Sequence, residues 1–229
     1  MKRRLFMLCI PFVLVGCALT NTQTIIDWVD FIKLNDTQYY GIYETELASD
    51  DFLGDVTSVV QFKLDENITT TSYKSKNGDA AFHEKGTEIY AIKGLEDVYA
   101  IQADYKINGY QIYFEDGSMN SYRFATMPQE EVHKVELHKM NEQGDYKLLT
   151  TLNDQTEIQS FLAFLNESEE NQNFEPKTID QDPTSFEMVF YSDAPIAHRY
   201  GLQYDGETYY WYPWETATLD EDIGEYFKE

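Results

Sequence analysis

Cysteine is almost absent from this chain. Only Cys9 and Cys17 occur among its 229 residues, and both lie close to the N-terminus. Residues 18–229 contain no thiol, which excludes disulfides, thiolate metal sites and a cysteine nucleophile from this part of the protein. A fold without such cross-links must be stabilised by its core alone. About 210 residues are enough for one large unit or for two units of about 100 residues each.

Basic residues are also scarce. The chain has 17 Lys and Arg against 41 Asp and Glu, which gives a formal net charge of −24. Because few cationic side chains are available to neutralise phosphates, the composition argues against binding nucleic acid or lying flat on an anionic membrane. Cations, basic polypeptides and neutral ligands remain as partners, although an acidic surface can equally serve solubility alone.

Familiar catalytic motifs are missing as well. The sequence has no G-x-S-x-G elbow, no P-loop and no G-x-G-x-x-G. His83 and Glu84 lack the second histidine of H-E-x-x-H, and His133 and His138 fall on opposite faces of an expected strand. The sequence therefore predicts neither a metal site nor a bound cofactor. Paired carboxylates could serve a hydrolase, but with 41 acidic residues no particular pair is indicated.

The N-terminus has the pattern of an export signal. Three basic residues at positions 2–4 precede an apolar run over residues 5–15. This run is about half the roughly 20 residues that a helix needs to span a bilayer, so it predicts a secretory signal that is removed rather than a permanent anchor. Cys17 follows directly after Leu14, Val15 and Gly16.

The four residues Leu-Val-Gly-Cys resemble the lipobox of bacterial lipoproteins. The resemblance implies that residues 1–16 are a lipoprotein signal peptide and that the Cys17 sulfur receives a diacylglyceryl group with acyl chains such as palmitate. Residues 17–24 would be the lipidated cysteine and a polar tether, and acylated Cys17 would hold the protein in the lipid bilayer, on the extracytoplasmic face of the cell membrane. Loss of three basic residues with the signal leaves a mature charge of −27. An ordinary signal peptide with an incidental cysteine is the alternative.

Residues 25–125 have the pattern of a β-rich domain. In residues 99–107 apolar and polar side chains alternate with the period of a sheet that has one wet face. Asn108 and Gly109 supply a turn, and the alternation resumes at Tyr110, which predicts a hairpin. Further strands are expected over residues 28–34, 56–64 and 87–93.

Residues 131–229 indicate an α+β domain. Asp154 and Glu157 have the spacing of a capping box ahead of apolar residues at helical spacing, which predicts a helix. Thr218 and Glu221 form a second capping box and predict a last helix. Strands are expected over residues 133–140, 146–152 and 186–191, with a long loop over residues 166–182. Together with the hairpin described below, this gives the order β-β-α-β-β-β-α, and the fold class expected for the whole chain is α+β, predominantly β.

Several segments resemble uncharacterised two-domain lipoproteins of Gram-positive, spore-forming bacteria. In the first half these are GDAAF at residues 78–82, KGTEIYAIKG at residues 85–94 and WVDFIKLND at residues 28–36. In the second half the segment is LNDQTEIQSFL at residues 152–162. The resemblance implies location and modularity and carries no activity.

Residues 198–214, HRYGLQYDGETYYWYPW, indicate a hairpin with a two-residue turn at Asp205 and Gly206. One face of the hairpin carries Arg199 and Gln203, so the opposite face is expected to lie in the core. The residues of that inward face are Tyr200, Leu202, Tyr209 and Trp211.

The outward face of this hairpin is the candidate functional strip. It would expose Tyr210, Tyr212 and Trp214, with Arg199 able to lie over an aromatic ring. Exposed aromatic side chains offer large contact area at little entropic cost, which suits stacking on a sugar ring or gripping a peptide. The alternative is that the strip packs against the first domain or the last helix, or that Tyr210 only covers Gly201 on the neighbouring strand.

Two functional hypotheses follow. The preferred one is a non-catalytic lipoprotein that binds or scaffolds an envelope protein, peptide or glycan. The alternative is a cell-envelope hydrolase that acts on wall polymer or peptide through an unidentified carboxylate pair. Two convergent, partly buried carboxylates beside Tyr210 and Tyr212 would favour the hydrolase.

Overall fold

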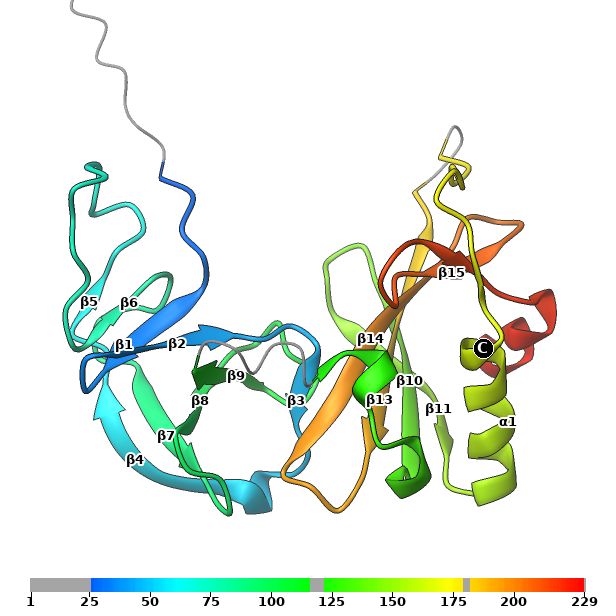
Figure 1. Cartoon of the computed structure of the whole chain (residues 1–229), viewed down its shortest axis with the longest axis horizontal. Helices are drawn as coiled ribbons and strands as arrows, with labels where there is room; N and C mark the ends of the chain where they lie inside the picture. The colour runs from blue at the N-terminus through cyan, green and yellow to red at the C-terminus, as the bar shows by residue number, and fades with distance from the viewer. Residues whose placement is uncertain (1–25, 116–121, 179–181, 229) are drawn as a thin grey trace, which may run out of the picture.

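The computed structural model describes residues 26–115, 122–178 and 182–228. The predicted signal peptide, Cys17 and the tether lie outside these residues. The described chain is α+β and predominantly β, as predicted: two eight-stranded sheets lie side by side along the long axis, with α1 at the far end of the second (Figure 1). Within these described ranges, no helix is long and apolar enough to cross a membrane.

The first sheet is built from strands between residues 31 and 115. Its pairs are antiparallel except for the short parallel pair β5–β6. The strand expected over residues 56–64 is divided between β4 and β5. In the order in which they pair, the strands are β4 (Leu53–Val59), β7 (Glu88–Ile92), β8 (Val98–Gln102), β9 (Tyr110–Glu115), β2 (Thr37–Gly41), β1 (Phe31–Leu34), β6 (Asp79–Ala80) and β5 (Phe62–Lys63).

The hairpin predicted around Asn108 and Gly109 exists, but its turn is longer than two residues. Gln102 pairs with Tyr110, so residues 103–109 form a loop instead of continuing the strand. Polar contacts hold this loop in place: Lys106 is buried, and its Nζ donates to the backbone oxygens of Tyr43 and Thr45 at 3.0 and 2.5 Å. The loop thereby brings a buried ammonium group to the junction of the two halves.

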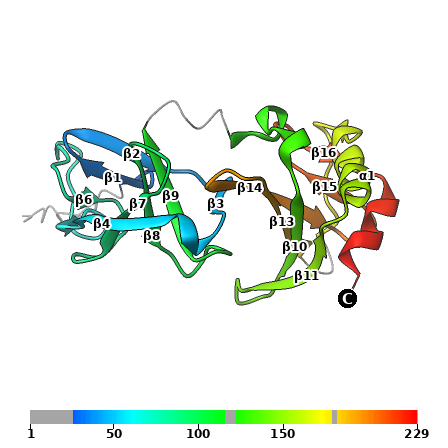
Figure 2. The same cartoon turned by 90° about the horizontal axis from the view of Figure 1, so that it is seen from below.

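The second sheet combines strands from both halves of the chain. Strand β3 (Thr45–Leu47) precedes most of the first sheet in sequence, yet it pairs with β14 of the second (Figure 2). A short strand, β12, lies within the segment expected to be a loop. The remaining strands, in the order in which they pair, are β11 (Tyr146–Leu152), β10 (Lys134–Met140), β13 (Thr184–Tyr191), β14 (Ile196–Tyr204), β15 (Tyr209–Trp211), β16 (Ala217–Thr218) and β12 (Glu169–Glu170).

Helix α1 (Gln155–Asn166) follows its predicted capping signal. The Asp154 side chain accepts hydrogen bonds from the backbone N–H groups of Thr156 and Glu157, which satisfies donors that have no partner within the helix. Its apolar stripe is fully buried against the second sheet, where it forms the largest core cluster of the described chain. The buried stripe consists of Ile158, Phe161, Leu162 and Leu165.

The last helix starts later than predicted. Thr218 belongs to β16, and Asp220 is the N-cap of a 3₁₀ helix, η5 (Glu221–Phe227). Pairing of β16 with β15 keeps Thr218 extended, so the expected Thr218–Glu221 capping box does not form. Three apolar side chains of this segment are nevertheless buried, those of Leu219, Ile223 and Phe227. The part of the chain that the structure describes also contains the shorter 3₁₀ turns η1 (Asp50–Phe52), η3 (Phe124–Thr126) and η4 (Gln129–Glu131).

The two faces of the second sheet differ in chemistry. Alternate residues of β13 and β14, such as Met188 and Leu202, pack with α1 in the apolar core. The residues between them include Glu187 and Arg199, which are buried although charged. Tyr43 and Glu46, from the first half of the chain, supply polar partners of these charges. This polar face positions the site described next.

Candidate functional site

The hairpin of β14 and β15 has a four-residue turn where the sequence predicted two residues. Leu202 pairs with Trp211, and Tyr204 pairs with Tyr209. The Asp205 carboxylate organises the turn, because it accepts hydrogen bonds from the backbone N–H groups of residues 177, 207 and 208. Although burial opposes it, these hydrogen bonds lower the pKa of Asp205. The pairing is shifted by two residues, an even number, so each side chain keeps its predicted face.

The predicted inward face is therefore confirmed, whereas the predicted strip is divided. Tyr210 is buried, with 1% of its surface exposed, so the expectation that it is solvent-exposed is wrong. The cause is Phe174, whose ring lies 5.0 Å from the Tyr210 ring. Tyr212 and Trp214 do point to solvent, with exposed fractions of 58% and 64%.

The expectation that Arg199 lies on an outward face is also wrong, because Arg199 is fully buried and is held by partners from both halves. Its Nε donates to Glu187 Oε2 at 3.1 Å, and its Nη1 donates to Glu46 Oε1 at 2.8 Å. Nη2 donates to the hydroxyls of Tyr43 and Tyr146, and the guanidinium lies over both rings at 4.5 and 4.9 Å. The predicted contact with an aromatic ring thus exists, but the rings lie outside the strip. Burial opposes the charge of Arg199, yet the carboxylate of Glu187 raises its pKa above the usual value.

A second cation, Lys106, balances this cluster. Its Nζ lies 3.4 Å from Glu46 Oε1, and both side chains are fully buried. Burial lowers the pKa of Lys106 to about 8, against the opposing attraction of Glu46. Two cations, Arg199 and Lys106, face two anions, Glu46 and Glu187, so the charges at this buried junction are compensated. We call these four residues the junction cluster.

Beside the junction cluster lies another polar group, centred on Glu136. Lys134 Nζ donates to Glu136 Oε1 and Tyr191 Oη donates to Oε2, both at 2.8 Å, while His138 Nε2 lies 3.4 Å from Oε2. The His138 ring beside Oε2, together with the hydrogen bonds from Lys134 and Tyr191, lowers the pKa of Glu136 to about 2 despite burial. Asn108 links this group to the first half through its amide, which donates to Tyr191 Oη at 3.0 Å.

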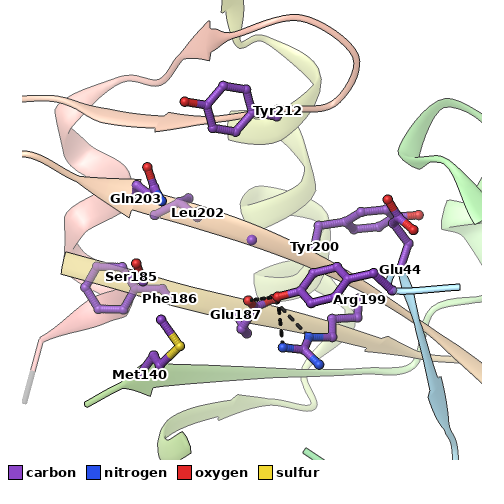
Figure 3. A pocket seen from close by; sticks show the side chains of 12 residues that line it. Glu44, Met140, Ser185, Phe186, Glu187, Arg199, Tyr200, Leu202, Gln203 and Tyr212 are labelled. Atoms are coloured by element: carbon purple, nitrogen blue, oxygen red, sulfur yellow. Dashed lines mark hydrogen bonds and ion pairs between the residues drawn. The ribbon is translucent and has the colours of Figure 1, made fainter. Parts of the chain in front are cut away.

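A cleft of about 320 Å³ opens over the polar face of β13 and β14 (Figure 3). Its floor lies at Gly201, where an added Cβ would meet Glu187 Oε1 at 3.7 Å, an ordinary van der Waals contact. Tyr212 forms one wall, and Glu187 and Arg199 lie on the far side of the opening in Figure 3. The lining residues are Tyr43, Glu44, Met140, Ser185, Phe186, Glu187, Arg199, Tyr200, Gly201, Leu202, Gln203 and Tyr212.

A smaller cavity of about 200 Å³ adjoins this cleft. The two share Glu44, Tyr200 and Tyr212 as lining residues. Trp214 lines the smaller cavity, and the Arg123 guanidinium lies 3.8 Å from its ring centroid. The two exposed members of the predicted strip therefore line these concave sites: Tyr212 lines both, and Trp214 lines the smaller cavity.

The chemistry of the cleft suits binding. The Tyr43 hydroxyl donates to Glu187 Oε1 at 2.6 Å, and Arg199 Nε occupies Oε2, so both oxygens of this buried carboxylate have donors. Such a fixed network holds the Glu187 carboxylate in place before a ligand arrives. Among the described residues, no group of three or more histidine, cysteine or acidic side chains could hold a metal ion.

Sequence reasoning missed Tyr43, Glu44 and Glu187 as cleft residues. Tyr43 and Glu44 lie just before β3, whose pairing with β14 brings them to the second sheet. Glu187 sits within β13 as a charged residue between Phe186 and Met188, which is the one local signal that could have marked it. Comparisons with protein-family models, curated proteins and solved structures found no match.

Proposed function

We propose that this protein is a lipid-anchored binding protein of the cell envelope and that its ligand occupies the cleft over Gly201. In this proposal, acylated Cys17 holds the chain in the bilayer at the extracytoplasmic face. The ligand would be a component of the envelope, either a protein or peptide segment or a glycan. The resemblance of residues 14–17 to a lipobox supports the location.

One observation carries the binding function: the cleft has a fixed polar floor and an exposed aromatic wall. Glu187 is held by Tyr43 and Arg199, so the floor is ordered before a ligand arrives. Tyr212 is 58% exposed and offers its ring for contact. Binding sites typically combine a preformed concave surface, apolar or aromatic walls and a few placed polar groups.

A hydrolase remains the second candidate, because Glu44 and Glu187 both line the cleft. General acid–base chemistry would need one of them to exchange a proton with substrate. Glu187 is hydrogen-bonded at both oxygens, and Glu44 is exposed, so this pair fits binding better than proton transfer. The hydrolase candidate predicts that purified protein releases fragments from wall polymer and that Glu187→Gln abolishes the release.

The location is tested with Cys17→Ala. In the proposal, wild-type protein sediments with membranes and its N-terminal peptide carries the mass of the acyl groups, whereas Cys17→Ala loses both properties. Equal membrane attachment of the two proteins would overturn the lipid anchor.

The cleft is tested separately with Gly201→Val, which places a branched side chain on its floor. Fragments of wall glycan and envelope peptides are titrated into the wild type and Gly201→Val by calorimetry. We expect at least one class to bind the wild type and to lose affinity for Gly201→Val. Affinities that are unchanged by Gly201→Val would show that binding occurs elsewhere.

A further inference from the structure

The cleft and the smaller cavity share one carboxylate, that of Glu44. Glu44 is exposed, and within residues 26–115, 122–178 and 182–228 its side chain forms no ion pair or hydrogen bond. Its backbone is fixed, because the carbonyl oxygen accepts a hydrogen bond from the Arg199 N–H at 3.0 Å. The fixed backbone therefore holds the unpaired carboxylate of Glu44 between the cleft and the smaller cavity.

The other charges of the cleft compensate each other. Glu187 is paired with Arg199, whose Nε lies 3.1 Å from its carboxylate. Among the lining residues this leaves Glu44 as an uncompensated charge, and the cleft carries a net charge of −1. In the smaller cavity Arg123 offsets Glu44, so the larger cleft is the more negative of the two.

Arg199 is poorly suited to bind an anionic ligand. A guanidinium has five N–H donors. Four hydrogen bonds from Arg199 already go to Glu187, Glu46 and two tyrosine hydroxyls. An incoming carboxylate or phosphate would therefore compete with these contacts and would also meet the charge of Glu44.

The walls suit the apolar and cationic parts of one ligand. Tyr212 packs edge-to-face on buried Tyr210, with ring centroids 6.0 Å apart at 85°, which supports the exposed ring. A cation over an aromatic face gains electrostatic attraction from the ring quadrupole. Met140 lines the same cleft and provides contact for an alkyl chain.

We propose that the cleft binds an organic cation, a primary ammonium or guanidinium group at the end of an alkyl chain, with Glu44 as its counter-ion and Tyr212 as its aromatic wall. This inference rests on the proposed binding function and names the chemistry of its ligand. The mature charge of −27 favours the encounter, because a strongly acidic protein attracts cations over a distance. A lysine side chain of a polypeptide and a free polyamine share this chemistry.

The test uses calorimetry with the detergent-solubilised lipidated protein and matched probes. One is the blocked tripeptide acetyl-Ala-Lys-Ala-amide, and the second is the same peptide with its ammonium neutralised by acetylation. Spermidine represents the polyamine source, and a chitooligosaccharide represents a neutral glycan. We expect the lysine peptide to bind about fivefold to tenfold more tightly than its acetylated form at low ionic strength, with a smaller ratio at physiological salt.

Two variants with the same change of charge locate the effect. Glu44→Gln is expected to abolish the preference for the charged peptide. Glu96→Gln removes another exposed carboxylate, from the turn between β7 and β8, and is expected to retain the preference. Tighter binding of spermidine than of the lysine peptide would assign the polyamine as the source, and the reverse would assign a polypeptide.

The outcomes separate this inference from the proposed function. If the charged and acetylated peptides bind equally well and both lose affinity for Gly201→Val, the preference for a cation is refuted, but the cleft is still a binding site. If only the glycan binds tightly and this binding is lost in Gly201→Val, the cation is likewise refuted and the cleft is still a binding site. No measurable binding of either cation overturns the inference. A preference for the charged peptide that persists in both Glu44→Gln and Gly201→Val overturns the inference and places that binding outside the cleft.

Discussion

Arg199 Nη1 lies 2.8 Å from Glu46 Oε1, and both side chains are completely buried although 153 residues separate them in the chain. The contact joins β14 to β3, so it ties the second sheet to a strand from the first half. Removing one partner of a buried ion pair leaves the other charge without compensation, which is far more costly than removing both. The junction cluster therefore couples the two halves of the chain energetically.

The first prediction is a double-mutant cycle on this contact. Glu46→Gln and Arg199→Met are each expected to lower the free energy of unfolding by about 3–5 kcal/mol. The double variant leaves Lys106 and Glu187 as one cation and one anion, so it is expected to lose less than the sum of the single changes. Urea unfolding followed by circular dichroism measures all four proteins. Strictly additive losses would contradict the coupling.

The second prediction concerns acid. Burial lowers the pKa of both His83 and His198 to about 4, whereas an unperturbed histidine titrates near pH 6.5. Between these values the unfolded chain binds more protons than the folded chain, so the free energy of unfolding falls as the pH falls from about 6.5 to about 4. Below this window Glu136, with its pKa lowered to about 2, continues the loss as the pH falls further.

His83→Gln isolates one of these titrations. In the native protein His83 Nε2 and Tyr113 Oη share a hydrogen bond of 2.5 Å, and glutamine can also form a hydrogen bond at this position without titrating. We expect the slope of unfolding free energy against pH in this window to decrease by up to about 1.4 kcal/mol per pH unit. Urea midpoints measured across the window give the slope, and measurement above pH 7 gives the cost of the lost contact. An unchanged slope would mean that His83 does not titrate with unfolding.

Local sequence patterns are sufficient for elements whose signals lie within a few residues. Helix α1 has its cap at Asp154 and a stripe of apolar residues at helical spacing, and both features act within the helix itself. The inward face of the β14–β15 hairpin is likewise predictable, because alternation alone determines which side chains share a face. A shift of two residues in pairing leaves that assignment intact.

The cleft could not be derived in this way. Its residues come from segments that are distant in sequence, and Glu44 reaches the second sheet only because β3 pairs with β14. Strand β3 has three residues, too few to show alternation, and its central Glu46 is a residue type that is rarely buried. Its burial depends on the two cations of the junction cluster, Lys106 and Arg199.

The third prediction uses the open floor of the cleft. A methyl group at Gly201 would meet Glu187 Oε1 at 3.7 Å and no atom more closely, so Gly201→Ala is expected to change the free energy of unfolding by no more than about 0.5 kcal/mol. Gly54→Ala is the matched control in a strand, because its Cβ would meet the Ala91 carbonyl oxygen at 2.9 Å and is expected to be destabilising. Thermal unfolding compares the two. A large loss for Gly201→Ala would show that no free space exists over the strand.

The last prediction separates packing from binding within the predicted aromatic strip. Tyr210→Ala removes a side chain that is 1% exposed and covered by Phe174, so it is expected to cost about 3–5 kcal/mol of unfolding free energy. The Tyr212 side chain, two residues away, is 58% exposed. Tyr212→Ala is therefore expected to cost about 0.5 kcal/mol of unfolding free energy and to weaken binding of the lysine peptide. Melting temperature and calorimetric affinity are measured for both. If Tyr212→Ala destabilises the fold as much as Tyr210→Ala and leaves affinity unchanged, the Tyr212 ring serves packing and the aromatic wall of the cleft loses its assigned role.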